Sequence, residues 1–307
     1  MIHTHPSQPQ MQAEVILASK ADTLAPVVSI RVRCPRIIWA EVMTHRVFSR
    51  NARSSRAVPI ETMLAEIKTI PFVPWHWGKN QKGMQADVEC NARVGAWRGY
   101  DVDFEGSSRQ EAWLSARDKA VESAMGFAEA GYHKQVVNRL VEPFMWIDAL
   151  ITANQWDNFF ELRDHPMAEP HFQDLAALMR KAIAESPVQV LTGGQWHLPY
   201  IDRKRDVPLA FNHLTQTNRA IPAEGEVDAV LKMVSAARCA RISYAPFDGR
   251  GDFKSEIARF EGLVAAPPIH ASPVEHQCTP DFQGWPHLHG NLPGWVQFRK
   301  LLENQYA

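Results

Sequence analysis

The sequence lacks the features of a membrane-spanning or secreted protein. No apolar run is long enough to cross a bilayer, and the first residues have neither the basic start nor the apolar core of a signal peptide. The 4 cysteines are widely spaced and form no C-x-x-C pair, which argues against a disulfide framework and against a cysteine zinc site. We therefore expect a cytoplasmic protein with reduced thiols and no metal.

The chain also lacks a strong net charge and a glycine-rich dinucleotide motif. Its formal net charge is -1, whereas a nucleic-acid surface needs a broad basic field. No G-x-G-x-x-G follows a strand, so FAD would not be held by a dinucleotide-binding βαβ unit. With 307 residues, 45% of them hydrophobic, the chain can bury a full core as one large domain or two small ones.

The most informative stretch that is present runs from Thr44 to Arg56, T-H-R-V-F-S-R-N-A-R-S-S-R. Its arginines alternate with serines, an asparagine and a histidine, and it contains no acidic residue. Guanidinium groups fit phosphate oxygens, and hydroxyls and amides fill the remaining acceptor positions. The composition therefore indicates an organic phosphate or a dinucleotide as the ligand, with a solvated basic face as the alternative.

Short β-branched runs predict strands at residues 14–18 and 27–33. A helix is predicted from about 37 to 47, followed by a loop to Pro59 that contains most of the arginine-rich stretch. Apolar residues at helical spacing predict the remaining helices, near 61–68 and over 112–130, 145–163, 172–184, 226–241 and 253–264, with a final helix around 294–302.

The predicted helix over 145–163 is too apolar to be exposed, so it should lie at the centre of the domain or of an oligomer interface. Asn154, Asn158 and Arg163 would share one face of it, where one buried polar ligand would satisfy them together. Residues 60–112 are rich in loops. Residues 187–223 are predicted to be an irregular connection, either a lid or a surface excursion.

Several segments together resemble a known family. The pattern H-R-x-x-S-x-N-x-x-S-x-R from His45 to Arg56 is similar to the signature R-H-R-x-x-S-x-N-E-x-S-x-R of flavin-dependent thymidylate synthases, the ThyX family, with Thr44 and Ala52 at the departures. Further landmarks are Arg139 shortly before a proline and T-A-N-x-x-x-N-F-F-x-L-R ending at Arg163.

Two more landmarks lie in the last third, A-A-R-x-x-x-x-S-Y at 236–244 and H-x-S-P-x-E-H at 270–276. They resemble the segments that open ordinary members of the family, ahead of the arginine motif, but here they follow it. The resemblance therefore implies a circular permutation, which is feasible where chain termini lie close together at a surface.

The resemblance implies an α+β fold with an antiparallel sheet and long central helices in permuted order. The chain would be a single catalytic domain, with the arginine motif and core helices in 1–186, a connecting loop in 187–223 and the permuted flavin-site part in 224–307. The family builds its flavin site between the subunits of a homotetramer, so a homo-oligomer, most simply a tetramer, is expected.

The implied reaction is transfer of a one-carbon unit from methylenetetrahydrofolate to C5 of a pyrimidine deoxynucleotide monophosphate, with FAD and NADPH, most simply dUMP to dTMP. Cysteine-dependent thymidylate synthases attack C6 with a thiolate, and no cysteine lies in the arginine-rich stretch or beside Arg139 or Arg163. The alternatives are a dCMP or dUMP methylase or hydroxymethylase, of the kind a nucleotide-modifying virus needs, and a non-catalytic nucleotide-binding protein.

The resemblance also implies the site residues. Arg163 would polarise the pyrimidine, and Ser54 and Arg56 would hold the phosphate, so these three are the catalytic candidates. The substrate would be bound by Arg53, Ser54, Ser55, Arg56, Arg139 and Arg163. The flavin would be lined by His45, Arg46, Ser49, Asn51, Asn154, Asn158, Ser243, His270 and Ser272.

Two positions of the motif need replacements. In the family a glutamine and an arginine reach the phosphate, and here Glu41 and Thr44 stand in their places. Gln297 and Arg299 would take over these contacts, unless the predicted final helix is simply amphipathic and packs inward. Another enzyme interpretation, a metal held by His287-x-His289 with His270 or His276, lacks an accompanying carboxylate.

Overall fold

A computed structural model describes residues 1–302 except 23, 87, 96, 99, 100, 103–105, 219, 220 and 265–268. Its main sheet has the order β1-β2-β3-β7-β4, with antiparallel neighbours, and a short strand β8 pairs in parallel with β2. The predicted mixed fold with an antiparallel sheet is confirmed. The strands are β1 (Ile2–His5), β2 (Gln8–Lys20), β3 (Val27–Pro35), β4 (Ser49–Ala52), β5 (Trp97–Arg98), β6 (Asp101–Val102), β7 (Trp146–Ala153), β8 (Gln189–Val190), β9 (Cys278–Pro280) and β10 (Trp295–Gln297).

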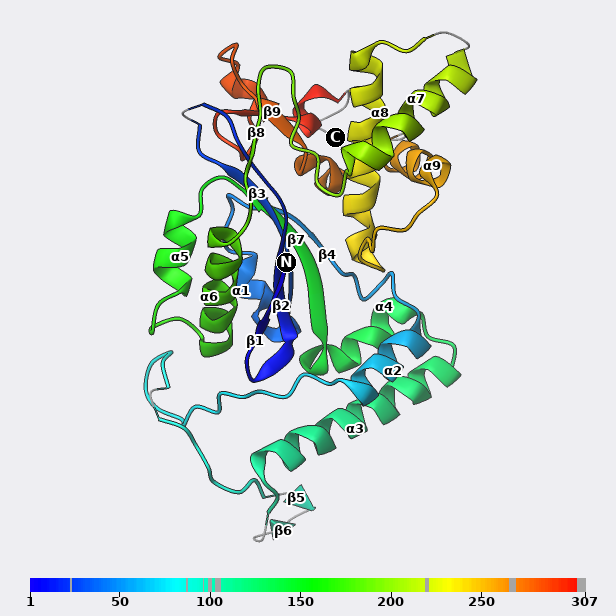
Figure 1. The fold of residues 1–307 in the computed structure, drawn as a ribbon. Coiled ribbons are helices and arrows are strands. Elements are labelled where there is room, and N and C mark those ends of the chain that lie inside the picture. The colour runs from blue at the N-terminus through cyan, green and yellow to red at the C-terminus, as the bar shows by residue number, and fades with distance from the viewer. Residues whose placement is uncertain are drawn as a thin grey trace.

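The α-helices form three groups around the sheet (Figure 1). On one sheet face lie α1 (Trp39–Val42), α5 (Asp157–Arg163) and α6 (Pro170–Ala184); a second group is α2 (Ile60–Thr69), α3 (Arg109–Glu129) and α4 (Lys134–Val137); a third is α7 (Arg203–Asn218), α8 (Glu224–Ala240) and α9 (Phe253–Val264). The 3-10 turns are η1 (Arg36–Ile38), η2 (Asn138–Phe144), η3 (Arg241–Ser243), η4 (Ser272–Glu275), η5 (Pro286–Leu288) and η6 (Phe298–Leu301). Among the described residues, no helix is both long and apolar enough to cross a bilayer.

The predicted helices near 61–68 and over 112–130, 172–184, 226–241 and 253–264 are confirmed, and α3 shows why such segments are readable. Ser108 and Glu111 form a capping box at its start, each side chain accepting from the other's backbone N–H. Gly131 follows its end with a φ of 84°, a left-handed conformation that glycine adopts without steric cost.

The main sheet has one apolar and one polar face. The even-numbered residues of β3 from Val28 to Cys34 are buried against α1, α5 and α6. Because side chains alternate along a strand, Ser29, Arg31 and Arg33 lie on the opposite face. The last third of the chain packs on this polar face, with β4 and β7 contacting η3 and β4 also contacting η4.

Two buried histidines, one in the connection 187–223 and one in the last third of the chain, hydrogen-bond to the polar face of the sheet. Ser29 Oγ lies 2.6 Å from Thr152 Oγ1 and 2.9 Å from His197 Nε2, while Thr152 Oγ1 lies 2.8 Å from His276 Nδ1. Burial lowers the pKa of His197 and of His276 to about 3, so both rings are uncharged at neutral pH. The contacts of these two histidines with Ser29 and Thr152 are therefore hydrogen bonds between neutral groups.

The predicted helix over 145–163 was wrong. Trp146–Ala153 is the strand β7, buried along its whole length, and only Asp157–Arg163 is helical. A strand between two others, covered on both faces, shows a continuous apolar run that periodicity cannot distinguish from a buried helix. Asn154 consequently does not share a helix face with Asn158 and Arg163.

Four further predictions were wrong in part. The helix at 37–47 ends at Val42, and Ser49–Ala52, expected in a loop, is the edge strand β4. The expected irregular connection contains the helix α7, and the expected final helix is β10 followed by η6.

Two of these segments are short strands whose conformation depends on pairing. β4 and β10 have only 4 and 3 residues, and their pairing with β7 and β9 overrides local propensity. α7 is mostly polar and carries Pro208, so it shows no apolar stripe.

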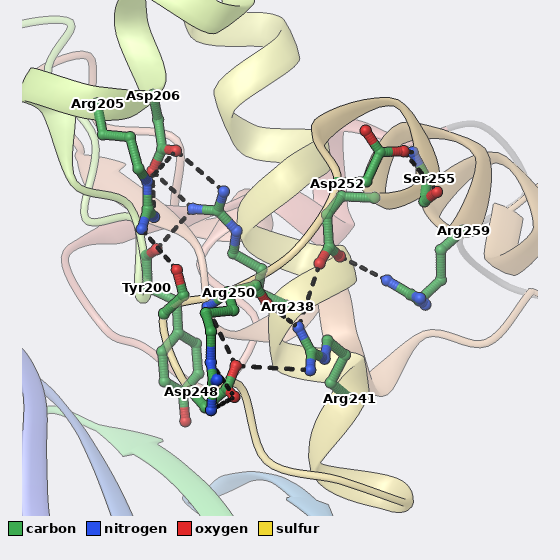
Figure 2. A network of polar contacts seen from close by, with 12 residues as sticks. Tyr200, Arg205, Asp206, Arg238, Arg241, Asp248, Arg250, Asp252, Ser255 and Arg259 are labelled. Carbon is green, nitrogen blue, oxygen red and sulfur yellow. Dashed lines mark hydrogen bonds and ion pairs between the residues drawn. The ribbon is translucent and has the colours of Figure 1, made fainter.

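A buried ion pair ties α7 to α8 (Figure 2). Nη1 and Nη2 of Arg238 bond the two carboxylate oxygens of Asp206 at 2.6 and 3.0 Å, and Arg238 is 3% exposed and Asp206 0%. Burial alone would raise the pKa of Asp206, but hydrogen bonds from Arg238 and Arg205 lower it to about 2. This bidentate, charge-assisted contact fixes the helices beside the sheet.

Asp206→Ala is expected to lower the free energy of unfolding by about 3–5 kcal/mol, because it leaves a guanidinium buried and unpaired. Urea unfolding followed by tryptophan fluorescence measures the change. Asp228→Ala, which removes a partly exposed pair with Arg203, should cost less than about 1 kcal/mol.

The same pair predicts an acid limit. The folded pKa of Asp206, about 2, lies below its ordinary value of 3.8, so the stabilisation is complete above that ordinary value and is lost as the pH falls toward 2. A shift of less than about 1 kcal/mol in Asp206→Ala would contradict the buried pairing.

Candidate functional site

Strand β4 and the loop after it contact segments that lie far away in the sequence. The backbone N–H of Ser54 donates to the carbonyl of Ser243 at 2.9 Å, and Nδ2 of Asn51 donates to the carbonyl of Cys239 at 3.5 Å. Ser49 accepts a hydrogen bond from Nε2 of Gln297 at 3.2 Å. The fold thus brings the arginine-rich stretch into direct contact with the last third of the chain.

Beneath this contact lies a buried polar floor. Ser49 and Gln297 are buried, and Gln297 Nε2 also donates to Asn291 and to the carbonyl of Glu275. Asn51 and Asn154 are buried as well, and each keeps an amide oxygen without a hydrogen-bond partner among the described residues. These two acceptors therefore find no donor within the part of the chain that the structure describes.

Arg163 and His45 form a second cluster, beside α1. Nε of Arg163 donates to Nε2 of His45 at 3.0 Å, Nη1 pairs with Glu41 at 3.1 Å, and the guanidinium stacks on Phe172 at 4.8 Å. Because Nε2 of His45 accepts, the ring is neutral and carries its proton on Nδ1. Burial, followed by the charges of Arg163 and Arg50, lowers the pKa of His45 to about 4.

The arginines of the motif have different environments. Arg50 donates to the carbonyl oxygens of Met43 and His45 at 2.9 and 3.0 Å, closing the end of α1. Arg53, predicted as a second phosphate cation, has a side chain only 9% exposed and pairs with Glu66 at 2.6 Å. Arg46 and Arg56 are exposed.

The loop that carries Ser54, Ser55 and Arg56 is held by a residue that the sequence did not single out. Asn138 is fully buried, and its Nδ2 donates to the carbonyls of Ser55 and Val58 at 2.7 and 3.0 Å. The next residue, Arg139, is exposed. The only sequence signal for Asn138 is its place next to Arg139 in a family landmark.

The remaining predicted residues fall into two groups. Arg46, Asn158, His270 and Ser272 are exposed on the surface of the chain. Arg299 pairs with Glu275. The phosphate roles of Gln297 and Arg299, and the flavin role of the exposed group, stay predictions.

A histidine metal site and a nucleophilic cysteine find little support in the geometry. His289 uses both ring nitrogens, one with Asp281 at 2.7 Å and one accepting from the N–H of Gly294 at 3.0 Å. Across the described ranges, no cluster of three or more ligand-type side chains could hold a metal ion. The four cysteines are free, and burial raises the pKa of three of them, which makes them poor nucleophiles; these are Cys34, Cys239 and Cys278.

Comparisons with known proteins give a faint likeness. No family model and no curated protein matches the sequence. Among solved structures, the chain is similar to the UMP/dUMP methylase PolB from Streptomyces cacaoi. The structure of PolB bound with 5-Br UMP matches at 17% identity and a TM-score of 0.40, covering 57% of this chain and 89% of PolB. The structure of PolB bound with 5-Br dUMP matches at 17% identity and a TM-score of 0.35, covering 53% of this chain and 67% of PolB. At such scores the likeness carries no argument about function.

Asn138→Ala is expected to loosen the loop 54–58, because it removes two hydrogen bonds to backbone carbonyls, each worth about 0.5–1.5 kcal/mol. Hydrogen exchange of the peptides covering 53–59 should speed up by about 10-fold or more. Asn158→Ala, at an exposed position, should leave exchange of this loop unchanged. Equal protection in both variants would show that the loop is held by other contacts.

Proposed function

We propose that the protein transfers a one-carbon unit to C5 of a pyrimidine deoxynucleotide monophosphate in a flavin-dependent reaction. The observation that supports this most is the convergence on β4. Ser54 contacts Ser243, Asn51 contacts Cys239, and the loop of Ser55 is held beside Arg139 by Asn138. Segments that resemble separate landmarks of one family thus meet in space, although 188 positions separate Asn51 from Cys239 in the sequence. A permuted ThyX-like fold is part of the proposal.

The buried floor fits a flavin. Asn51 and Asn154 offer unpartnered amide oxygens, and a flavin carries ring N–H and ribityl O–H donors that suit them. When bound, reduced FAD would supply the hydride that converts a methylene group to methyl, with NADPH as its reductant. Methylenetetrahydrofolate would be the carbon donor.

The chain's own residues would bind and polarise the nucleotide. Arg56 and Arg139 are exposed cations on segments joined through Asn138, which suits a phosphate. Arg163 would donate to a pyrimidine carbonyl and stabilise charge that develops on the ring. His45 and Glu41 hold its guanidinium in place, so little reorganisation would be needed during the reaction.

The site would be shared between copies of the chain. Figure 1 shows α5, which ends at Arg163, and α4, next to the loop of Arg56, on opposite sides of β7. One chain would therefore offer its phosphate loop to a nucleotide that the Arg163 cluster of another copy polarises. We propose a homo-oligomer, most simply a tetramer, on this ground.

An anaerobic assay with FAD, NADPH and methylenetetrahydrofolate, read by mass, tests the reaction. A gain of one CH2 on dUMP means thymidylate synthesis; the same gain on dCMP, or added oxygen on either, means synthesis of a modified nucleotide. No product from either nucleotide would contradict the proposal. Colourless protein that still binds nucleotide would favour the non-catalytic alternative.

Arg163→Ala is expected to lower kcat by about 10²–10³-fold, because a preorganised donor to the developing charge is lost. Arg180→Ala is the matched control, since Arg180 also stacks on a phenylalanine, Phe160, but is half exposed and pairs with Asp164. Retained turnover in Arg163→Ala would remove Arg163 from the mechanism.

A further inference from the structure

A cavity of about 470 Å³ opens on the polar face of the sheet, outside the clusters described above. β2 and β3 form its floor, residues 198–205 one wall, and the loop 247–249 another. A neighbouring cavity of about 350 Å³ shares Glu14 and Arg31 with it. Ligand sites often lie in such clefts between packed units, here between the sheet and the last third of the chain.

The floor of the cavity carries an ion pair with spare hydrogen-bonding capacity. Glu14 and Arg31 are direct partners across β2 and β3, and Nη2 of Arg31 lies 2.7 Å from Oε2 of Glu14. Both side chains are about a quarter exposed, at 24% and 23%. Within the described part of the chain, no other hydrogen-bond partner of either side chain is found, so carboxylate acceptors and guanidinium donors remain side by side.

The walls are aromatic and held rigidly. Tyr200 and Phe247 meet edge to face at 5.6 Å, and the guanidiniums of Arg238 and Arg241 cover Phe247 at 4.7 and 5.1 Å. Figure 2 shows the ring of Tyr200 pointing away from Asp206 and Arg238.

The backbone around the cavity is irregular at two points. Tyr200 has a φ of 65°, a strained backbone conformation for a residue with a side chain. A register shift between Val15 and Leu17 bends β2 at the cavity. Bulges and strained residues of this kind concentrate beside binding sites.

We propose that this cavity binds a planar heterocycle with a 2-amino-4-oxo amide edge, the chemistry shared by pterins and guanine. Glu14 would accept the ring N–H and the amino group, and Arg31 would donate to the carbonyl oxygen. A heterocycle that has an exocyclic amine but no ring N–H beside it, such as adenine, leaves one carboxylate oxygen without a donor. The cavity lining has three carboxylates, of Glu14, Asp202 and Asp248, and only two arginines. This balance of charge disfavours a bare phosphate as the ligand.

Two sources of this chemistry have different consequences. A folate would make the cavity the docking site of the carbon donor, and that outcome rests on the proposed function. A guanine nucleotide would make it a regulatory site, independent of the reaction. The loop that roofs the cavity starts beside Ser243, whose carbonyl contacts Ser54, so either ligand would lie one short segment away from the arginine-rich loop.

Isothermal titration of the full-length protein with 5-formyltetrahydrofolate, GMP and AMP tests the proposal. We expect one of the first two to bind, with AMP weaker by about 10-fold or more, since it makes fewer charge-assisted hydrogen bonds. Glu14→Gln should weaken binding by about 10-fold or more, and so should Arg31→Lys, which keeps the charge but loses the planar fork. Asp228→Asn, at the partly exposed pair with Arg203 and away from the cavity lining, is the control and should bind like the wild type.

Tight folate binding supports the carbon-donor site, and tight GMP binding supports the regulatory site. Failure of both ligands to bind, AMP binding as tightly as GMP, or full affinity in correctly folded Glu14→Gln and Arg31→Lys would overturn the proposal. Titration of the same preparations with dUMP and dCMP tests the proposed function separately from the cavity proposal. If dUMP or dCMP binds but neither 5-formyltetrahydrofolate nor GMP does, the cavity proposal fails and the proposed function stands.

Discussion

The arrangement of this protein depends on how the polar face of its sheet is covered. Ser29 and Thr152 stand on adjacent strands and hydrogen-bond to His197, from the connection 187–223, and to His276, from the last third of the chain. Almost any amphipathic helix can pack on an apolar sheet face. A polar face needs partners that match its donors and acceptors, because each buried polar group left without a hydrogen bond costs about 1–3 kcal/mol. This requirement fixes the position of α8 and η4, and through them the contacts of β4.

The arginines illustrate how environment divides one residue type among several roles. Arg238 is buried and paired with Asp206, Arg53 belongs to an ion pair with Glu66, and Arg50 closes a helix end. Arg56 is left in solvent. Within the arginine-rich stretch, Arg50 and Arg53 thus have acceptors inside the fold, whereas Arg46 and Arg56 are exposed to solvent.

The two candidate clusters lie on opposite sides of β7 (Figure 1). The Arg163 cluster lies with α1, α5 and α6, whereas the loop of Arg56 lies next to α4 and η2. The proposed homo-oligomer would account for this division, because a symmetric interface would join each cluster to the complementary cluster of a neighbouring copy. The exposed positions of Arg46, Asn158 and His270 fit the same arrangement.

The sequence by itself determined the elements whose signals are local. α3 has its capping box and terminal glycine, α6 has an apolar stripe, and β3 alternates, so each was predicted. The residue types of the arginine-rich stretch and its resemblance to one family were likewise readable. These features need no knowledge of distant partners, since propensity, capping and periodicity act within a few residues.

Tertiary structure decided the rest. β7 is a strand because β3 and β4 pair with both of its edges, and no local pattern shows that. Asn138 acquired its contacts with the loop, and Arg53 its ion pair with Glu66, through residues at least 13 positions away. The cavity beside Glu14 and Arg31 exists only because residues near 200 and 247 fold over them. Long-range packing selects among conformations that the local sequence leaves nearly equal in energy.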